Sequence, residues 1–327
     1  MKKSGVSQAT VAKHAGVSSM TVSRVLSTPE IVDADTRERV LASIVETGYV
    51  ANKRTRTICV LISSIANNTF TETVSGVSEA ASSAGYDIIL GDIGYSKDQE
   101  VQVVSTMLSR RPDGIVISST DHTRKTKTLL KNAGIPIVEI WDYPQRPVDM
   151  VAGYSNIEAG ELAADYFYAK GYRRFAYFGN EFQRDRSRWE GFCERAKDLT
   201  GNSPQFIHAL SSKNGTHSFK AGDEFFRHFK TMKKKPDAVF CSSDVLGAGI
   251  IFSAARQGIP MPDTVAVCGF GDSAFAEAIF PALTTIRVPA YDMGVQAGSM
   301  IIAENSGQRV IDKKVKLSLE IAERQST

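Results

Sequence analysis

The chain has 327 residues, of which 42% are hydrophobic and 23% are charged, with a formal net charge of +3. This is the balance of an ordinary globular protein, and the length suits two or three domains better than one small core. The sequence holds no apolar run long enough to cross a bilayer, and no apolar stretch follows the two lysines of its first residues, MKKSGVSQ. We therefore expect a cytoplasmic protein with neither a signal peptide nor a membrane partner.

The positive charge is concentrated at the N-terminal end. Residues 1–57 carry nine Lys or Arg and five acidic residues, whereas residues 58–327 carry nearly equal numbers of the two signs. A basic end on a near-neutral body indicates a polyanionic partner for that end alone.

The cysteines form no CxxC pair, and three of the four lie within apolar runs that are typical of strands. We expect buried free thiols rather than disulfides or a zinc site, and no metal or cofactor is predicted. The four are Cys59, Cys193, Cys241 and Cys268.

The first fifty residues predict three short helices, over about 7–14, over 18–26, and from Asp33 or Asp35 to Gly48. Gly16 lies in the turn between the first two, where glycine allows the positive φ that a tight turn needs. Two helices joined by a short glycine-containing turn form a helix-turn-helix unit.

The outward face of the second helix is suited to DNA. It carries small hydroxyls, Met20 and Arg24, and no acidic residue occurs from Gly16 to Thr28. Such side chains fit phosphate oxygens and base edges. We expect Ser19 and Met20 to contact bases, with Arg24 next. The expected phosphate contacts are Ser7, Ser18, Thr21, Ser23, Ser27 and Thr36, together with Lys53 and Arg54.

From residue 58 onwards, apolar runs alternate with amphipathic stretches. This pattern predicts parallel sheets covered by helices on both faces, and eight strands are enough for two doubly wound lobes. Ligands of such folds bind at the carboxyl ends of the strands. The predicted strands are 58–63, 86–92, 114–118, 135–141, 175–179, 205–210, 237–243 and 264–270, and the predicted helices are 70–84, 98–110, 157–170, 187–199, 218–232 and 245–257.

Three N-terminal motifs closely resemble the lactose/galactose repressor family: VAKHAGVSSMTVSRVL (11–26), VDADTRERV (32–40) and GYVAN (48–52). Later segments are also similar to the family: RWEGF (188–192), GIPMPDTVAVCGF (258–270) and PALTTI (281–286). The resemblance implies a homodimeric transcriptional repressor that binds a double-stranded DNA operator under the control of a small effector. Its body would be a periplasmic-binding-protein-like α/β core.

The resemblance also implies domain boundaries. We expect a helix-turn-helix domain over 1–52, a linker over 53–57 and an effector domain over 58–327. One lobe would comprise about 58–155 and 285–310. The other would comprise about 156–284 and 311–327.

The resemblance places the effector contacts on residues from several strand ends. Arg188 in RWEGF corresponds to the main polar anchor for sugar hydroxyls in the family. The expected effector contacts comprise the positions that the resemblance gives and the basic and hydroxyl residues beside them. They are Asn68, Phe70, Thr120, His122, Asp142, Arg184, Arg188, His217, Ser243 and Asp272. His122 and His217 are equally compatible with ordinary loop histidines.

Departures from the family pattern favour an anionic effector. Ser243 replaces an Asn that often binds hydroxyls, and Gly271-Asp272 replaces a more polar pair, whereas Arg184, Arg186 and Arg188 remain. Arginine pairs strongly and directionally with carboxylates. Local patterns at 94–95, 120–123 and 138–142 are similar to the gluconate-responsive branch, so gluconate or a related sugar acid is the expected effector.

The linker departs furthest from the family pattern. Family members carry a hinge helix that inserts a leucine wedge into the minor groove. Here NKRTRT (52–57) leads directly into the first strand. We expect Lys53, Arg54 and Arg56 to contact phosphates instead, with weaker or differently regulated DNA binding. A sugar or sugar-phosphate sensor with weakened DNA binding is therefore an alternative.

Other functional classes are less well supported. The chain lacks the GxSxG, HExxH and GxxxxGK[ST] motifs, and the aspartates at strand ends have no activated nucleophile beside them, so we do not expect an enzyme. A transport-type binding protein would need a signal peptide. A regulator with a phosphorylated effector or a protein corepressor remains open. Because leucine heptads are absent, a dimer is expected rather than a tetramer.

Overall fold

The computed structural model describes residues 7–49, 55–65, 68–180, 182–209 and 218–327. Its contacts divide the chain into two compact units, Met1–Arg54 and Thr55–Thr327. Residues 55–57 of the expected linker belong to the second unit, because Thr57 already begins its first strand.

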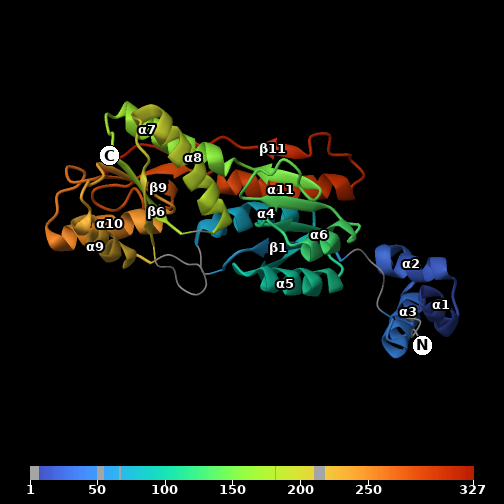
Figure 1. The fold of residues 1–327 in the computed structure, drawn as a ribbon. Helices are drawn as coiled ribbons and strands as arrows, with labels where there is room; N and C mark the ends of the chain where they lie inside the picture. Colours follow the sequence, from blue (N-terminus) through green and yellow to red (C-terminus); the bar gives the residue numbers. More distant parts are fainter. Residues whose placement is uncertain (1–6, 50–54, 66–67, 181, 210–217) are drawn as a thin grey trace. The chain divides into compact units, whose positions relative to one another are not determined.

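Residues 7–49 of the first unit form three α-helices and one 3₁₀ helix, and the three α-helices occur where the sequence predicts them (Figure 1). Ser7, Ser18 and Asp33 each accept a hydrogen bond from a backbone amide three residues on, which defines the helix starts. The elements are α1 (Gln8–Ala15), α2 (Ser19–Ser27), η1 (Pro29–Ile31) and α3 (Ala34–Thr47). Their shared core is built from valines and alanines, namely Val11, Ala12, Ala15, Val22, Val25 and Val40.

The first lobe of the second unit is a parallel sheet in the order β11-β5-β4-β3-β1-β2. Alternate residues of β1 face two separate apolar clusters, so helices cover both faces. The strands are β1 (Thr57–Ile62), β2 (Asp87–Asp92), β3 (Gly114–Ile117), β4 (Ile137–Ile140), β5 (Met150–Gly153) and β11 (Lys314–Lys316). Its helices are η2 (Asn68–Phe70), α4 (Thr71–Ser83), α5 (Lys97–Ser109), α6 (Arg124–Lys131) and α11 (Ala290–Asn305).

The second lobe repeats this architecture with the order β12-β10-β9-β8-β6-β7, in which β12 runs antiparallel to β10. The strands are β6 (Phe175–Gly179), β7 (Gln205–His208), β8 (Ala238–Cys241), β9 (Ala266–Gly271), β10 (Thr284–Arg287) and β12 (Glu320–Ala322). Its helices are α7 (Asn156–Ala169), α8 (Gln183–Thr200), α9 (Ala221–Thr231) and α10 (Asp244–Gln257). Cys59, Cys241 and Cys268 are buried in strands of the two sheets, as the apolar runs predict.

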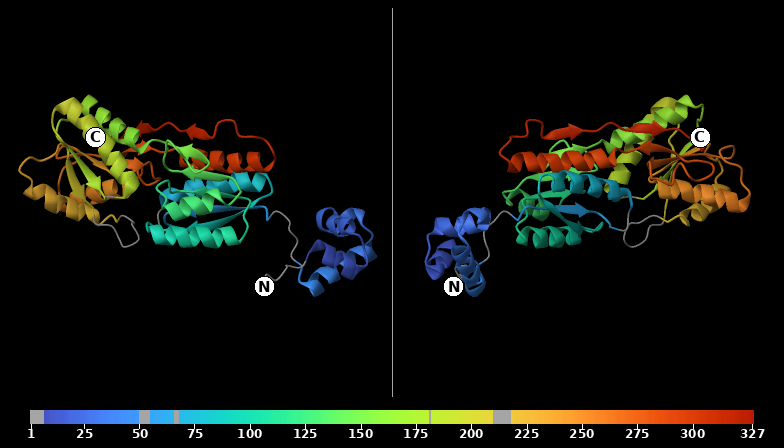
Figure 2. Two further views of the ribbon diagram at one scale, coloured as in Figure 1. Left: turned by 45° about the vertical axis from the view of Figure 1, so that its right-hand side comes forward. Right: turned by 180° about the vertical axis from the view of Figure 1, so that it is seen from behind.

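The chain crosses between the lobes at 154–155, 288–289 and 317–319 (Figure 2). Two expected lobe boundaries need correction. Residues 285–287 form part of β10 and pair with β9 in the second lobe, not the first. Residues 314–316 form β11 and pair with β5 in the first lobe, because the chain returns there before its last strand.

No helix among the described residues is both long and apolar enough to span a membrane.

Candidate ligand-binding cleft and DNA-binding face

Two adjoining cavities lie between the lobes, where the strands of both sheets end. The inner cavity has a volume of about 70 Å³ and the outer one about 250 Å³. Tyr95, Phe182 and Arg184 line both. This is the position in which doubly wound folds bind ligands, because loops at the carboxyl ends of parallel strands converge there.

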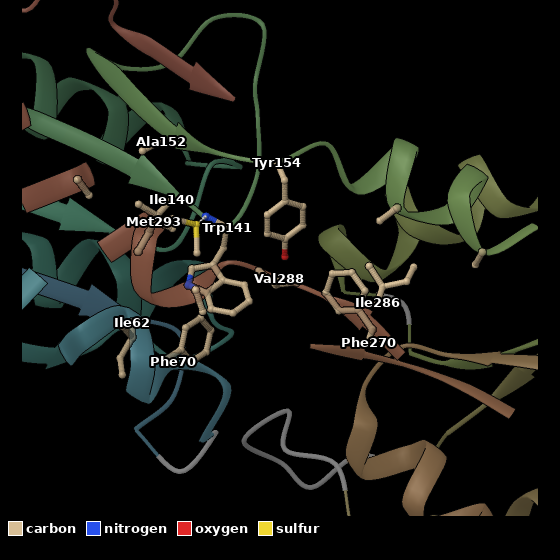
Figure 3. Packing of buried hydrophobic residues seen from close by; sticks show 14 of the residues in the cluster. Ile62, Phe70, Ile140, Trp141, Ala152, Tyr154, Phe270, Ile286, Val288 and Met293 are labelled. Atoms are coloured by element: carbon tan, nitrogen blue, oxygen red, sulfur yellow. Dashed lines mark hydrogen bonds between the residues drawn. The ribbon is translucent and has the colours of Figure 1, made fainter. Parts of the chain in front are cut away.

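A row of aromatic side chains crosses the inner cavity from one lobe to the other (Figure 3). The ring centroids are 5.1 Å apart for Phe70 and Trp141, 6.2 Å for Trp141 and Tyr154, and 5.9 Å for Tyr154 and Phe270. The Tyr154 hydroxyl points into the space between the lobes (Figure 3). Trp141 adopts a φ of +68°, a strained conformation for a bulky residue and one often found at functional sites.

Arg188 of α8 is the buried cation of the inner cavity. It donates to Asn156 Oδ1 at 2.6 Å, pairs with Asp185 and lies over the Phe270 ring, 4.2 Å from its centroid. Burial opposes the charge, but the neighbouring Asp185 carboxylate outweighs it and holds the pKa of Arg188 above its ordinary value. The guanidinium is therefore a permanent positive charge in a nearly dry site.

A chain of hydrogen bonds links Arg188 to the first lobe. Asn156 donates through Nδ2 to Asp142 Oδ1 at 3.0 Å, and the Thr120 hydroxyl donates to Asp142 Oδ2 at 2.8 Å. Asp142 is absent from the cavity walls, so it acts here by positioning Asn156 and Thr120. Because Thr120 and Asp142 lie in one lobe and Asn156 and Arg188 in the other, the chain connects the two lobes.

Four buried polar atoms of the inner-cavity walls have no hydrogen-bond partner: Trp141 Nε1, Tyr154 Oη, Arg188 Nε and Ser242 Oγ. An unsatisfied buried polar group costs roughly 1–3 kcal/mol, and such groups in folded proteins are normally paired. All four atoms can donate, and the Trp141 and Arg188 nitrogens can only donate. The inner cavity is therefore suited to a ligand that supplies several acceptors.

Arg184 lies where the two cavities meet. It donates to the Ser118 carbonyl at 3.0 Å and to Ser63 Oγ at 3.4 Å, both in the first lobe. Beside it, the rings of Tyr95 and Phe182 stack across the cleft with centroids 4.6 Å apart. These contacts hold α8 of the second lobe against strand ends of the first.

The cavities bring together half of the expected effector contacts. Phe70, Arg188 and Ser243 line the inner cavity, Thr120 the outer one, and Arg184 both. Asn68, in η2, is not among the lining residues. His217 lies outside the described residues.

His122 requires a correction, because the structure buries its ring away from both cavities. Its nitrogens lie 2.9 Å from Glu100 and 3.2 Å from Glu139, so two carboxylates turn the ring into the first lobe. Burial alone would lower the pKa of His122, but the interactions with these two carboxylates outweigh burial and raise the pKa to about 9. The imidazolium thus ties α5 to β4 behind the wall of the outer cavity.

Asp272 also lies away from the walls of both cavities. Arg287 contacts one of its carboxylate oxygens at 2.6 Å and Arg324 the other at 2.7 Å. Since two arginines already hold this carboxylate, Asp272 joins β9 to β10 and the C-terminal segment instead of reaching a ligand.

Sequence reasoning missed several cavity residues. Trp141, Tyr154 and Ser242 each follow the end of a buried strand, which is the signal that could have identified them. Tyr95 and Phe182 lie in loops whose path the sequence pattern does not give.

In the first unit, α2 presents an exposed polar face. Met20 is 64% exposed, and Ser18, Ser19, Ser23, Arg24 and Ser27 are exposed with it. Several expected phosphate contacts also have structural roles: Ser7 and Ser18 cap helices, Ser27 bonds to the Ser23 carbonyl, and the amide of Thr36 donates to Asp33. Lys53 and Arg54 lie outside the described residues.

A helix-turn-helix unit with an exposed polar helix, joined to a two-lobed unit with a ligand cleft, defines the class of ligand-controlled DNA-binding regulators. Residues 9–52 match the family described as bacterial regulatory proteins, lacI family, and residues 164–327 match a periplasmic binding protein-like domain. The chain is 30% identical to the HTH-type transcriptional regulator GntR of Escherichia coli (strain K12), over 98% of each chain.

Solved structures agree with this assignment. A LacI-family transcriptional regulator from Silicibacter pomeroyi is 28% identical with a TM-score of 0.80 over 98% of both chains. The transcription regulator GntR from Chromobacterium violaceum is 26% identical with a TM-score of 0.77, over 83% of this chain and 98% of that one. The chain therefore belongs to the LacI family of bacterial regulatory proteins. It is a DNA-binding repressor of sugar metabolism controlled by a small ligand.

Proposed function

We propose that the controlling ligand is a sugar acid, gluconate or a close relative, bound between the lobes. The four unpaired donors of the inner cavity carry this proposal, because they include Arg188 Nε and together match a carboxylate and its neighbouring hydroxyls. The similarity to regulators named GntR supports the same ligand class. Phe70, Thr120, Arg184, Arg188 and Ser243 are the proposed contacts.

Calorimetric titration with gluconate and with neutral hexoses tests the ligand class. We expect gluconate to bind more tightly, since a neutral sugar offers no charge to Arg188. Tight binding of a neutral hexose without binding of gluconate would contradict the proposal.

We further propose that the protein acts as a cytoplasmic homodimer whose two α2 helices enter successive major grooves of a pseudo-palindromic operator. The exposed Met20 and Ser19 would contact bases. Arg24 is the next candidate for a base contact. The proposed phosphate contacts are Ser7, Ser18, Thr21, Ser23, Ser27 and Thr36. Ligand would favour one lobe arrangement and release the DNA, which requires it to bind the two arrangements with different affinity.

The short linker has an anchored end in the second unit. The Thr55 hydroxyl donates to the Arg111 carbonyl at 3.0 Å and to Asp113 Oδ2 at 3.1 Å, and the Thr57 amide donates to the same carboxylate oxygen at 3.2 Å. Asn305, at the end of α11, donates to the Asp113 carbonyl at 3.0 Å. Asp113 would thus connect the linker to a helix that runs along the first lobe.

We propose that this anchor couples ligand binding to DNA binding, a role that a hinge helix performs in other family members. Without a leucine wedge the operator should be bent little. Fluorescence energy transfer between the ends of a labelled operator checks this point. A strongly bent operator would contradict it, and an absence of specific binding would favour the alternative of a sensor with weakened DNA binding.

A further inference from the structure

The outer cavity is larger than the inner one and differs from it in chemistry. Its walls carry three basic side chains, Lys97, Arg184 and Arg186, and two acidic ones, Glu100 and Asp121. Asp121 contacts Lys97 at 2.8 Å, and Glu100 contacts the buried His122 imidazolium at 2.9 Å. Glu100 shares that imidazolium with Glu139, which lies behind the wall, so the walls themselves carry one more basic than acidic side chain.

Two long helices begin at this cavity, one from each lobe. Ser96 and Phe182 are the N-cap residues of α5 and α8, and neither makes a side-chain capping hydrogen bond. The N-terminus of a helix carries a partial positive charge and amide donors, which favour an anion. Five hydroxyl residues line the same space: Ser63, Ser96, Ser118, Ser119 and Thr120.

The volumes indicate that one ligand occupies both cavities. At about 70 Å³ the inner cavity is far below the roughly 300–1,000 Å³ of ordinary small-molecule sites. The outer cavity adds about 250 Å³, and Arg184 borders both. A ligand with its carboxylate among the unpaired inner donors would therefore extend its other end into the outer cavity.

We propose that the outer cavity binds a phosphate group and that the preferred effector is a phosphorylated sugar acid, with its carboxylate in the inner cavity. This proposal rests on the proposed function. Guanidinium groups, hydroxyls and helix N-termini together form the donor set that phosphate oxygens prefer.

Calorimetry with gluconate, 6-phosphogluconate and glucose 6-phosphate tests the proposal on the full-length protein. We expect 6-phosphogluconate to bind at least tenfold more tightly than gluconate, because the phosphate gains charge-assisted hydrogen bonds. Glucose 6-phosphate should bind more weakly than 6-phosphogluconate, since it leaves the inner donors without a carboxylate. Equal affinity for gluconate and 6-phosphogluconate, or tighter binding of gluconate, would overturn the proposal.

A pair of variants tests whether the phosphate group lies in the outer cavity. Arg186→Gln should narrow the affinity ratio between 6-phosphogluconate and gluconate, whereas Arg195→Gln should preserve it, because Arg195 lies on the same helix but pairs with Asp165. An unchanged ratio in Arg186→Gln would overturn the assignment of the phosphate to the outer cavity. If glucose 6-phosphate alone binds, the carboxylate assignment fails and the phosphate site stands. If gluconate binds as tightly as 6-phosphogluconate, the phosphate assignment fails and the carboxylate assignment stands.

Discussion

Arg188 donates a hydrogen bond of 2.6 Å to Asn156, and through Asn156 the buried guanidinium of one lobe is joined to Asp142 of the other. The same guanidinium pairs with Asp185 and keeps one nitrogen, Nε, without a partner at the inner cavity. Arg188 therefore belongs to the hydrogen-bond chain that connects the lobes and is also the residue best placed to sense a bound anion.

Arg188→Lys should weaken gluconate binding at least tenfold. A single ammonium cannot contact Asn156 and Asp185 in the same planar geometry and also direct a donor at the ligand. Calorimetry measures the change, and Arg195→Lys on the exposed side of α8 serves as the control. Unchanged affinity in Arg188→Lys would show that the ligand does not reach this side chain.

The position of α8 depends on a close backbone contact with α7. A Cβ on Gly160 would overlap the Arg188 carbonyl oxygen, and a Cβ on Gly191 would overlap the Ile157 carbonyl oxygen. We expect Gly160→Ala to lower the free energy of unfolding by about 1–3 kcal/mol and to weaken ligand binding, because α8 must move away. Urea denaturation and calorimetry measure the two effects.

Glu194→Ala, on the exposed side of α8, is the matched control and should change stability by less than about 0.5 kcal/mol. Equal stability of Gly160→Ala and the parent protein would mean that the helix contact is looser than described.

Substitutions of Met20 in α2 and of Arg56 in the linker should affect DNA binding in different ways. Met20→Ala should change the preference among operator variants, because an exposed side chain at the start of a recognition helix contacts base edges. Arg56→Ala should weaken binding to all sequences and reduce the slope of log affinity against log salt by about one unit, because a phosphate contact carries no sequence information. Fluorescence anisotropy at several salt concentrations separates the two. A uniform loss in Met20→Ala would remove it from the base contacts.

His122 gives the ligand-binding unit a defined pH dependence. Its pKa is about 9 in the folded protein against an ordinary 6.5, because the hydrogen bonds to Glu100 and Glu139 outweigh burial; Asp121 is a further acidic neighbour. Since the folded pKa is the higher, the stabilisation is complete below about pH 6.5 and is lost as the pH rises through 9.

Urea denaturation between pH 6.5 and 9 should show this fall in the free energy of unfolding, and His122→Gln should flatten it. The variant is expected to be less stable at pH 6.5, where it lacks the imidazolium between two carboxylates. An equally steep fall in His122→Gln would assign the pH dependence to other groups.

Much of the fold could be predicted because its strands are buried on both faces and form continuous apolar runs. The run at 58–63 covers all of β1 except its first residue, and the run at 237–243 contains β8. The three-residue strands β11 and β12 have no such pattern, since they exist only by pairing with β5 and β10. Their assignment to different lobes depends on that pairing.

The ligand-binding site could be predicted only in part, because some of its contacts depend on the tertiary fold. The family resemblance, with the hydroxyl residues beside its positions, pointed to Ser243 and Thr120, which line the cavities. It could not show that His122 meets Glu100 and Glu139, because these three residues come from separate elements that only the tertiary fold brings together. The positive φ of Trp141 likewise has no local sequence signal.

The most direct test of the central claim is a fluorescence anisotropy titration of the full-length protein against its upstream DNA, with and without gluconate or 6-phosphogluconate. We expect a specific, salt-sensitive complex that one of these sugar acids dissociates. A specific complex that neither compound changes would contradict the proposed coupling between the cleft and the operator.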